Sequence, residues 1–124
     1  MEERRRLPDA ELEVMQAVWG HTPPVSRSDI QRTLEGRRPM AMTTLLTLLT
    51  RLADRGFLAV TRTGRSNCYT PLVSRQEYLA DQSRRFLRTV CGGSVPAFAA
   101  ALCDSGLTAE ELAELRRLLE EGSL

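Results

Sequence analysis

The stretch TTLLTLLTRLADRGFL, residues 43–58, decides the fold, together with AVTRTGRSNCYTPL, residues 59–72, which follows it directly. The first stretch predicts an amphipathic helix from about residue 41 to residue 55, closed by Gly56. One face of this helix is built for a core, because leucines recur at the i, i+3, i+4, i+7 spacing: Leu45, Leu48, Leu49 and Leu52. The second stretch predicts two short strands around a Gly-Arg-Ser-Asn turn at residues 64–67.

The other side of the predicted helix carries short polar side chains, which are Thr43, Thr47, Thr50 and Asp54, flanked by Leu46 and Arg51. Threonine is a mediocre helix former, so three of them on an exposed face are poor choices for helix stability alone. They do fit against base edges in a DNA groove. A solvated surface helix is the simpler alternative, but Arg62 and Arg65 in the hairpin stand where a wing would meet phosphates.

Charge is unevenly distributed along the chain. The formal net charge is +1, yet residues 21–73 hold eight arginines and three acidic residues, a net +5, and residues 74–124 hold six arginines and eight acidic residues, a net −2. This asymmetry is expected when only the first part contacts phosphate, with chance clustering as the alternative. All 17 basic residues are arginine, which we attribute mainly to codon bias, because surfaces with no binding role lack lysine too.

The composition argues against several other classes of protein. Cys68, Cys91 and Cys103 are widely spaced and form no CxxC pair, so we expect small buried hydrophobic residues rather than a disulfide framework, a zinc site or a redox switch. The sole histidine, His21, precedes Thr-Pro-Pro and has no catalytic motif around it, so we expect an exposed connector residue and no enzyme activity. Neither a leader nor a run of about 18 apolar residues is present, which favours the cytoplasm. No cofactor or metal is expected.

The sequence before residue 41 predicts two more helices. The first lies between Pro8 and Gly20, and His21-Thr-Pro-Pro after it forms a stiff connector. Ser26 with Asp29 caps a second helix that ends at Gly36. Helix, connector, helix, turn, helix and hairpin is the order of a winged helix-turn-helix domain, which we assign to residues 1–73.

Residues 74–124 predict three further helices. Ser74 with Glu77 forms a capping box, Gly92-Gly93 breaks the chain, a helix rich in small residues follows, and Thr108 caps the last helix. Leucines of that helix form either an intrachain core or a dimer seam, and we favour the seam because so little other core is available. We therefore predict a dimerisation domain with these contact residues: Tyr78, Phe86, Leu87, Phe98, Leu102, Leu112, Leu115 and Leu119.

Four segments resemble the penicillinase and methicillinase repressor family of the BlaI/MecI type, which also includes copper-responsive members. They run nearly end to end: LPDAELEVMQAVW, TTLLTLLTRLADRGFL, RTGRSNCYTPLVSRQEY and LTAEELAELRRLLEE. The resemblance implies a mainly α fold with a small β wing and a homodimeric winged-helix repressor. Its N-terminal part is expected to bind a dyad-symmetric operator in double-stranded DNA, and its C-terminal helices to interlock with those of a second subunit.

The residue pattern and the resemblance together predict a set of DNA-contacting residues: Met42, Thr43, Thr44, Leu46, Thr47, Arg51, Arg62 and Arg65. The threonines are expected to contact bases or backbone phosphates. Leu46 replaces a residue that is often polar in the family, so we expect apolar contact with a thymine methyl there. Met42 replaces a frequent proline at the helix start, which leaves the first turn less preset.

Two departures from the family concern its regulation. In staphylococcal-type members a membrane-bound receptor protease cleaves an Asn-Phe bond, and the aligned positions here are Ala100-Ala101, so the resemblance does not extend to that bond. The paired cysteines of the copper-responsive branch are absent, which argues against metal sensing.

A protein of another class also fits the sequence, namely a winged-helix protein-interaction module whose threonine face meets another protein. The arginines in the wing favour DNA over another protein as the binding partner.

Overall fold

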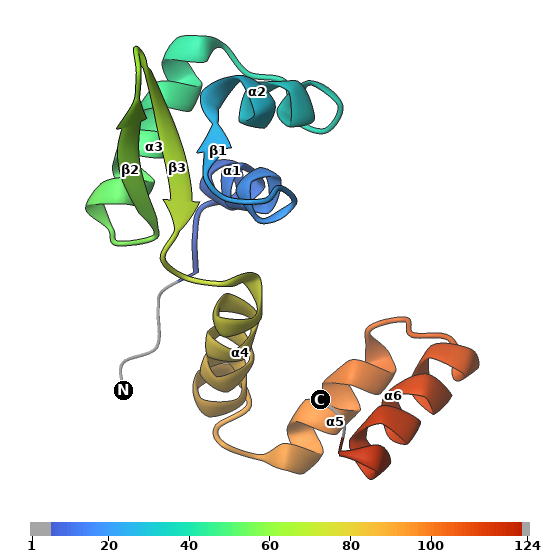
Figure 1. The fold of residues 1–124 in the computed structure, drawn as a ribbon. Helices are drawn as coiled ribbons and strands as arrows, with labels where there is room; N and C mark the ends of the chain where they lie inside the picture. The colour runs from blue at the N-terminus through green and yellow to red at the C-terminus, as the bar shows by residue number, and fades with distance from the viewer. Residues whose placement is uncertain (1–5, 123–124) are drawn as a thin grey trace. The chain divides into compact units, whose positions relative to one another are not determined.

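The computed structural model describes residues 6–122, which form helices and one small antiparallel sheet (Figure 1). The chain divides into two compact units between Gln82 and Ser83, which we call the first and the second unit. The sequence had placed its domain boundary after Val73. The first unit thus includes the start of the fourth helix, and the assignment of a separate role to each part of the chain stays a prediction.

The first unit has the predicted order of elements. Its elements are α1 (Asp9–Trp19), β1 (Val25–Ser26), α2 (Arg27–Glu35), α3 (Met42–Asp54), β2 (Leu58–Thr63), β3 (Ser66–Pro71) and most of α4 (Arg75–Arg85). The strands pair in the order β1-β3-β2, all antiparallel. This arrangement confirms a mainly helical winged helix-turn-helix. It adds the short strand β1, which follows the predicted connector at residues 21–24 and which no sequence pattern indicated.

The core of the first unit forms where α1, α2 and α3 meet the sheet. The four leucines predicted to face inward from α3 are at most 6% exposed. They pack with apolar side chains from the other elements, including Met15, Ile30, Phe57 and Tyr69. Because the leucines fix which side of α3 is buried, its opposite side must face outward.

The three helix caps that the sequence predicts are all formed. Ser26 Oγ accepts a hydrogen bond from Asp29 N at 3.1 Å and opens α2. Ser74 and Glu77 cap each other reciprocally at the start of α4, and Thr108 and Glu111 do so at the start of α6 (Ala109–Glu121). These bonds satisfy N–H groups that have no acceptor inside the helix.

The wing hairpin turns more tightly than predicted. Thr63 and Ser66 are paired, so only Gly64 and Arg65 form the loop, and Ser66 and Asn67 belong to β3. Gly64 has φ +63°, whereas no described residue other than glycine has a positive φ. A positive φ at the first loop position alone is the pattern of a type II′ turn, which matches the twist of paired strands.

Tyr78 lies in the core of the first unit, which corrects its predicted place in a dimer contact. Its side chain is 3% exposed, and its hydroxyl accepts a hydrogen bond from the backbone N–H of Leu7 at 2.8 Å. Its ring lies against Trp19 and Phe57, with centroid distances of 5.8 and 6.1 Å. The Trp19 indole in turn donates to the carbonyl of Val73 at 2.9 Å. These contacts explain why the first unit extends beyond Val73.

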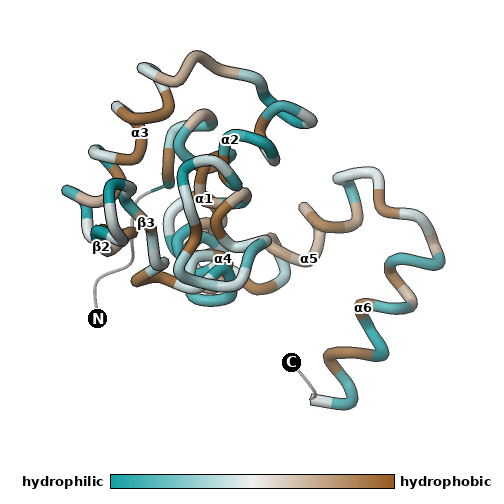
Figure 2. The backbone as a smooth tube through the Cα atoms, turned by 45° about the horizontal axis from the view of Figure 1, so that its top comes forward, coloured by the Kyte–Doolittle hydropathy of each residue, from teal (hydrophilic) through white to brown (hydrophobic). Residues whose placement is uncertain are grey.

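The second unit contains a π-helical turn, η1 (Phe86–Val90), and the helices α5 (Val95–Asp104) and α6. Positive φ angles at Gly92 and Gly93 mark the predicted break. Figure 2 shows hydrophobic residues at intervals along α6, separated by hydrophilic ones. Within residues 83–122 no residue is buried, although the rings of Phe86 and Phe98 meet edge to face at 5.5 Å. A single chain therefore gives this unit almost no core.

Among the described residues, no single helix is long and apolar enough to cross a membrane; only the bent pair Arg75–Val90 and Val95–Asp104, counted together, reaches that length and composition.

Candidate nucleic-acid interface

The outward side of α3 is a continuous exposed surface. The six α3 residues predicted to contact DNA are all exposed: Met42, Thr43, Thr44, Leu46, Thr47 and Arg51. Two of them are large apolar side chains, Met42 at 46% and Leu46 at 39% exposure. Since the leucines on the opposite side hold α3 in the core, this face is presented on a rigid support.

The threonine hydroxyls of this face are turned back onto the helix. Thr47 Oγ1 donates to the carbonyl of Thr43 at 3.0 Å, and Thr50 Oγ1 donates to the carbonyl of Leu46 at 2.9 Å. Each hydroxyl thereby uses its one proton and keeps its lone pairs free. In this state Thr47 presents a methyl group and a hydrogen-bond acceptor, which suit a thymine methyl or a base amino group.

The start of α3 lacks a side-chain cap. Its N-cap residue is Ala41, whose side chain makes no hydrogen bond to the first turn, and Met42 follows as the first helical residue. The first N–H groups of α3 are therefore not satisfied by a side chain. The expectation that Met42, in place of proline, leaves the first turn less preset stays a prediction.

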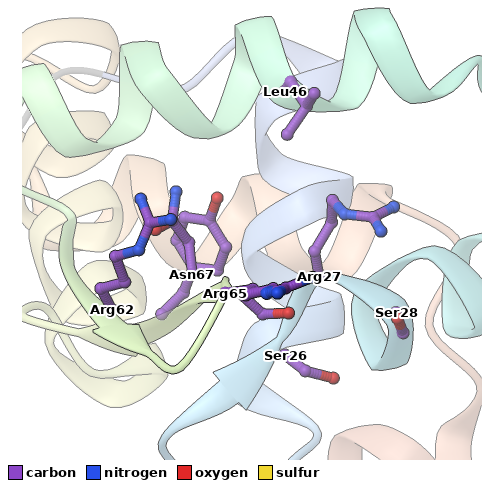
Figure 3. Close-up of a pocket in the computed structure, with 9 residues that line it drawn as sticks. Ser26, Arg27, Ser28, Leu46, Arg62, Arg65 and Asn67 are labelled. Atoms are coloured by element: carbon purple, nitrogen blue, oxygen red, sulfur yellow. The ribbon is translucent and has the colours of Figure 1, made fainter.

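A hollow of about 250 Å³ lies between the start of α2, the wing and α3 (Figure 3). We call it the basic hollow, and its lining residues are Ser26, Arg27, Ser28, Leu46, Arg62, Arg65, Ser66, Asn67 and Tyr69. In Figure 3, Leu46 extends from α3, Arg27 and Ser28 belong to α2, and Arg62, Arg65 and Asn67 belong to the hairpin. Of the predicted site residues, the hollow unites only Leu46, Arg62 and Arg65.

Sequence reasoning missed Arg27, Ser28 and Asn67. The start of α2 meets the wing because β1 pairs with β3, with Ser26 opposite Cys68. A two-residue strand shows no alternation in sequence, so no pattern indicated this pairing. The available signal was the Ser26 cap, which placed Arg27 in the first turn of α2 without saying what lies beside it.

The arginines of the basic hollow have no carboxylate partner within residues 6–122. Arg27 Nη1 donates to the neutral amide oxygen of Gln31 at 3.0 Å, and Arg62 Nε donates to the carbonyl of Gly64 at 3.2 Å. No Asp or Glu lines the hollow. Elsewhere in the first unit arginines do pair with acids, as Arg55 does with Glu11 at 2.6 Å. Positive charge is thus left uncompensated beside the exposed face of α3.

Two other residue types differ from expectation. Cys68 and Cys91 are half-buried and Cys103 is exposed, so none is the fully buried hydrophobic residue that we predicted. His21 is not a freely exposed connector residue: it is half-buried, with Nε2 at 2.8 Å from Thr33 Oγ1. Within residues 6–122 no group of three or more His, Cys, Asp or Glu side chains is arranged to hold a metal ion.

Comparison with known families matches residues 7–121 to the family described as penicillinase repressor. The chain belongs to this family. Penicillinase repressors are transcriptional regulators, which confirms the expectation of a regulator rather than an enzyme. One similar protein is the penicillinase repressor of Bacillus licheniformis, 30% identical over 117 residues, which are 94% of this chain and 91% of that protein. The transcriptional regulator BlaI of Mycobacterium tuberculosis is 36% identical over 75 residues, or 60% of this chain and 54% of that protein.

Solved structures of penicillinase repressors resemble the winged-helix part of the chain. The monomeric form of Bacillus licheniformis BlaI, solved in complex with the blaP half-operator, has a TM-score of 0.53 and 31% identity. The DNA-binding domain of the repressor BlaI has a TM-score of 0.54 and the same identity. Each match covers 63% of this chain and 94% of the other. The fold predicted from the sequence is therefore confirmed for this part of the chain.

Proposed function

We propose that this penicillinase repressor family member is a homodimeric transcriptional repressor that binds an inverted-repeat operator in double-stranded DNA. The observation that carries the proposal is the exposed face of α3 beside three arginines without carboxylate partners. The resemblance to BlaI solved with a half-operator supports it. Such a protein must share a compartment with the chromosome, which agrees with the cytoplasmic location that we propose.

In the proposed binding mode, α3 enters the major groove and the wing contacts flanking phosphates. Met42, Thr43, Thr44, Leu46 and Thr47 are the residues nearest the base edges, and their short or apolar side chains suit close approach. Arg51, Arg62 and Arg65 supply charge to the backbone. Half-site centres are expected about one helical turn, or a multiple of it, apart.

The proposed dimer rests on the second unit. Because no residue in 83–122 is buried within one chain, a second copy is the simplest source of the missing core. The contact residues that we retain, without Tyr78, are Phe86, Leu87, Phe98, Leu102, Leu112, Leu115 and Leu119. Loss of these contacts separates the two DNA-binding units, each of which binds one half-site. The gain in operator affinity from binding both half-sites at once, of order 10² or more, is then lost. A chain ending at Gln82, which keeps Tyr78, is expected to bind the operator more weakly by that factor.

Release from DNA would follow from weakening the dimer. The aligned positions for receptor cleavage, Ala100 and Ala101, lie inside helix α5, and helical backbone is a poor protease substrate until it unfolds. We therefore leave a membrane-bound receptor protease out of the proposed mechanism. A β-lactam response is likewise no part of it.

The decisive experiment is selection of bound fragments from genomic DNA, followed by anisotropy titration of the recovered site. We expect an inverted repeat, binding at least about 10³-fold tighter than to a scrambled duplex, and affinity that falls steeply with salt. A protein-interaction module would instead show no salt-dependent binding to any duplex. That result would refute the proposed function.

A further inference from the structure

The basic hollow brings together residues from the start of α2, from the wing and from α3. The proposed binding mode gives the wing and α3 separate contacts with DNA. Arg27 and Ser28 are the first two residues of α2, Arg65 is in the wing loop, and Leu46 projects from α3. The wall is rich in hydrogen-bond donors and carries three guanidinium groups. Such a wall has the composition of an oxyanion site, because guanidinium and hydroxyl groups are preferred phosphate ligands.

Size and charge both fit a single phosphate group. A volume of about 250 Å³ exceeds the space of a few water molecules, each of which takes roughly 30 Å³. The hollow therefore accommodates a tetrahedral oxyanion with some of its hydration. Arg27 spends one N–H on Gln31 and Arg62 spends one on Gly64, so both keep donors for a ligand.

We propose that the basic hollow receives one backbone phosphate of each operator half-site, held jointly by Arg27 from α2 and Arg65 from the wing. Ser28 and Asn67 are additional donors at its edge. This inference rests on the proposed function and extends it to residues outside the predicted set. A phosphate shared in this way connects the wing to α2. It thereby sets the position of Leu46, on the wall of the hollow, relative to the major groove.

The first test neutralises one phosphate at a time. A series of operator duplexes, each with one methylphosphonate linkage, is titrated against the full-length protein and against Arg27→Gln and Arg65→Gln. Wild-type binding should weaken about tenfold at one position in each half-site, since hydrogen bonds to charged groups are strong. At that same position each single variant should lose less affinity than the wild type, and the double variant Arg27→Gln/Arg65→Gln should show no further loss. If the two variants lose sensitivity at different phosphates, the shared site is refuted.

A matched control is available on the same helix. Arg32 has a side chain that is 75% exposed and pairs with Asp29 at 3.3 Å, and it does not line the hollow. Arg32→Gln should leave the methylphosphonate profile unchanged. Equal thermal unfolding of the three variants and the wild type shows that the changes are not caused by misfolding.

The salt dependence of binding provides a second, independent measurement. Each phosphate neutralised adds about 0.9 to the slope of log K against log salt. A homodimer carries the double variant in both protomers, so if Arg27 and Arg65 share one phosphate in each half-site, the slope on the full operator should fall by about 1.8. A loss of about 3.6 means two separate phosphates in each half-site and overturns the proposal.

Small phosphate compounds carry the same chemical group as the DNA backbone. A titration with inorganic phosphate distinguishes a free phosphate ligand from a DNA phosphate. Inorganic phosphate is titrated into the free protein while the amide signals of Ser28 and Asn67 are followed by NMR. Saturation at low millimolar phosphate that Arg27→Gln abolishes, combined with a flat methylphosphonate profile, assigns the hollow to a free phosphate compound and refutes the DNA contact. Absence of binding to any duplex would instead remove the proposed function itself.

Discussion

Arg55 Nη1 lies 2.6 Å from Oε1 of Glu11, a carboxylate whose side chain is only 2% exposed. Arg55 follows the end of α3, and Glu11 lies in the first turn of α1. The ion pair therefore links the end of α3, the helix that we propose contacts DNA, to α1. The Arg55 side chain is 49% exposed, so the Glu11 carboxylate accounts for most of the desolvation cost of the pair.

Arg55→Ala should destabilise the first unit by about 1–3 kcal/mol, because Glu11 is left buried without its partner. The loss should stay below the ~3–5 kcal/mol of a fully buried pair, since water reaches the exposed side of Arg55. Urea unfolding at fixed protein concentration measures it. Arg51→Ala, on the exposed face of the same helix, is the control and should change stability by less than about 0.5 kcal/mol. Equal effects of the two variants would contradict a structural role for the pair.

Tyr78→Phe should cost about 1–3 kcal/mol, because the buried N–H of Leu7 loses its acceptor while the rings around Tyr78 keep their contacts. Urea unfolding gives the free energy, and the exchange rate of the Leu7 amide hydrogen should rise. Gln76→Ala, at an exposed position of α4, serves as the control. Unchanged exchange at Leu7 would mean that the hydrogen bond is not formed in solution.

Gly64→Ala should destabilise the hairpin by roughly 1–2 kcal/mol. No atom lies within 4 Å of an added Cβ, so the cost comes from the φ of +63° alone. Gly20 is the matched control, because its φ is −78° and the nearest atoms to an added Cβ are carbonyl oxygens at 3.6 Å. Gly20→Ala should be neutral or stabilise by a few tenths of a kcal/mol, roughly. Thermal unfolding of both variants decides, and a neutral Gly64→Ala would rule out the turn assignment.

Thr47→Ala should weaken operator binding by about 1 kcal/mol, roughly fivefold, and leave binding to a scrambled duplex unchanged. Thr50→Ala removes a hydroxyl with the same intrahelical hydrogen bond one turn further along α3, so it controls for effects on the helix itself. Anisotropy titration with both duplexes gives the comparison. Equal losses on the two duplexes would take Thr47 out of base recognition.

Leu119→Glu should convert the dimer to a monomer and lower operator affinity by a factor of order 10². Leu119 is 59% exposed in the single chain, so a structural effect within one chain should be small. Ala113→Glu adds the same charge at another exposed position of α6 and should leave the dimer intact. Analytical ultracentrifugation reports the assembly state, and a dimer that persists in Leu119→Glu excludes this seam.

Sequence patterns located helices and strands well where a hydrophobic period or a helix cap could be recognised from neighbouring residues. The leucines of α3 show the 3.6-residue period over about two turns, and the capping pairs Ser74–Glu77 and Thr108–Glu111 mark helix starts locally. The tight hairpin loop was placed correctly at Gly64 but drawn two residues too long. Local rules identify a turn glycine more readily than the residue at which pairing resumes.

Features that depend on distant residues were not predictable in this way. Strand β1 has two residues and exists only through its pairing with β3, so the basic hollow beside it was missed. Tyr78 shows the apolar period of its own helix, but its partners Leu7, Trp19 and Phe57 come from far along the chain. The sequence identified it as apolar and helical without revealing which core it joins.

The second unit, with no buried residue of its own, has a consequence for how the amount of protein controls repression. A segment of this size gains little from folding alone, so in the proposed dimer its order would depend on meeting a second chain. When few copies are present, the concentration of this proposed dimer rises with about the square of the copy number, and therefore more steeply than the copy number itself. Modest changes in synthesis or degradation of the repressor would thus be amplified at the promoter, without any ligand being involved.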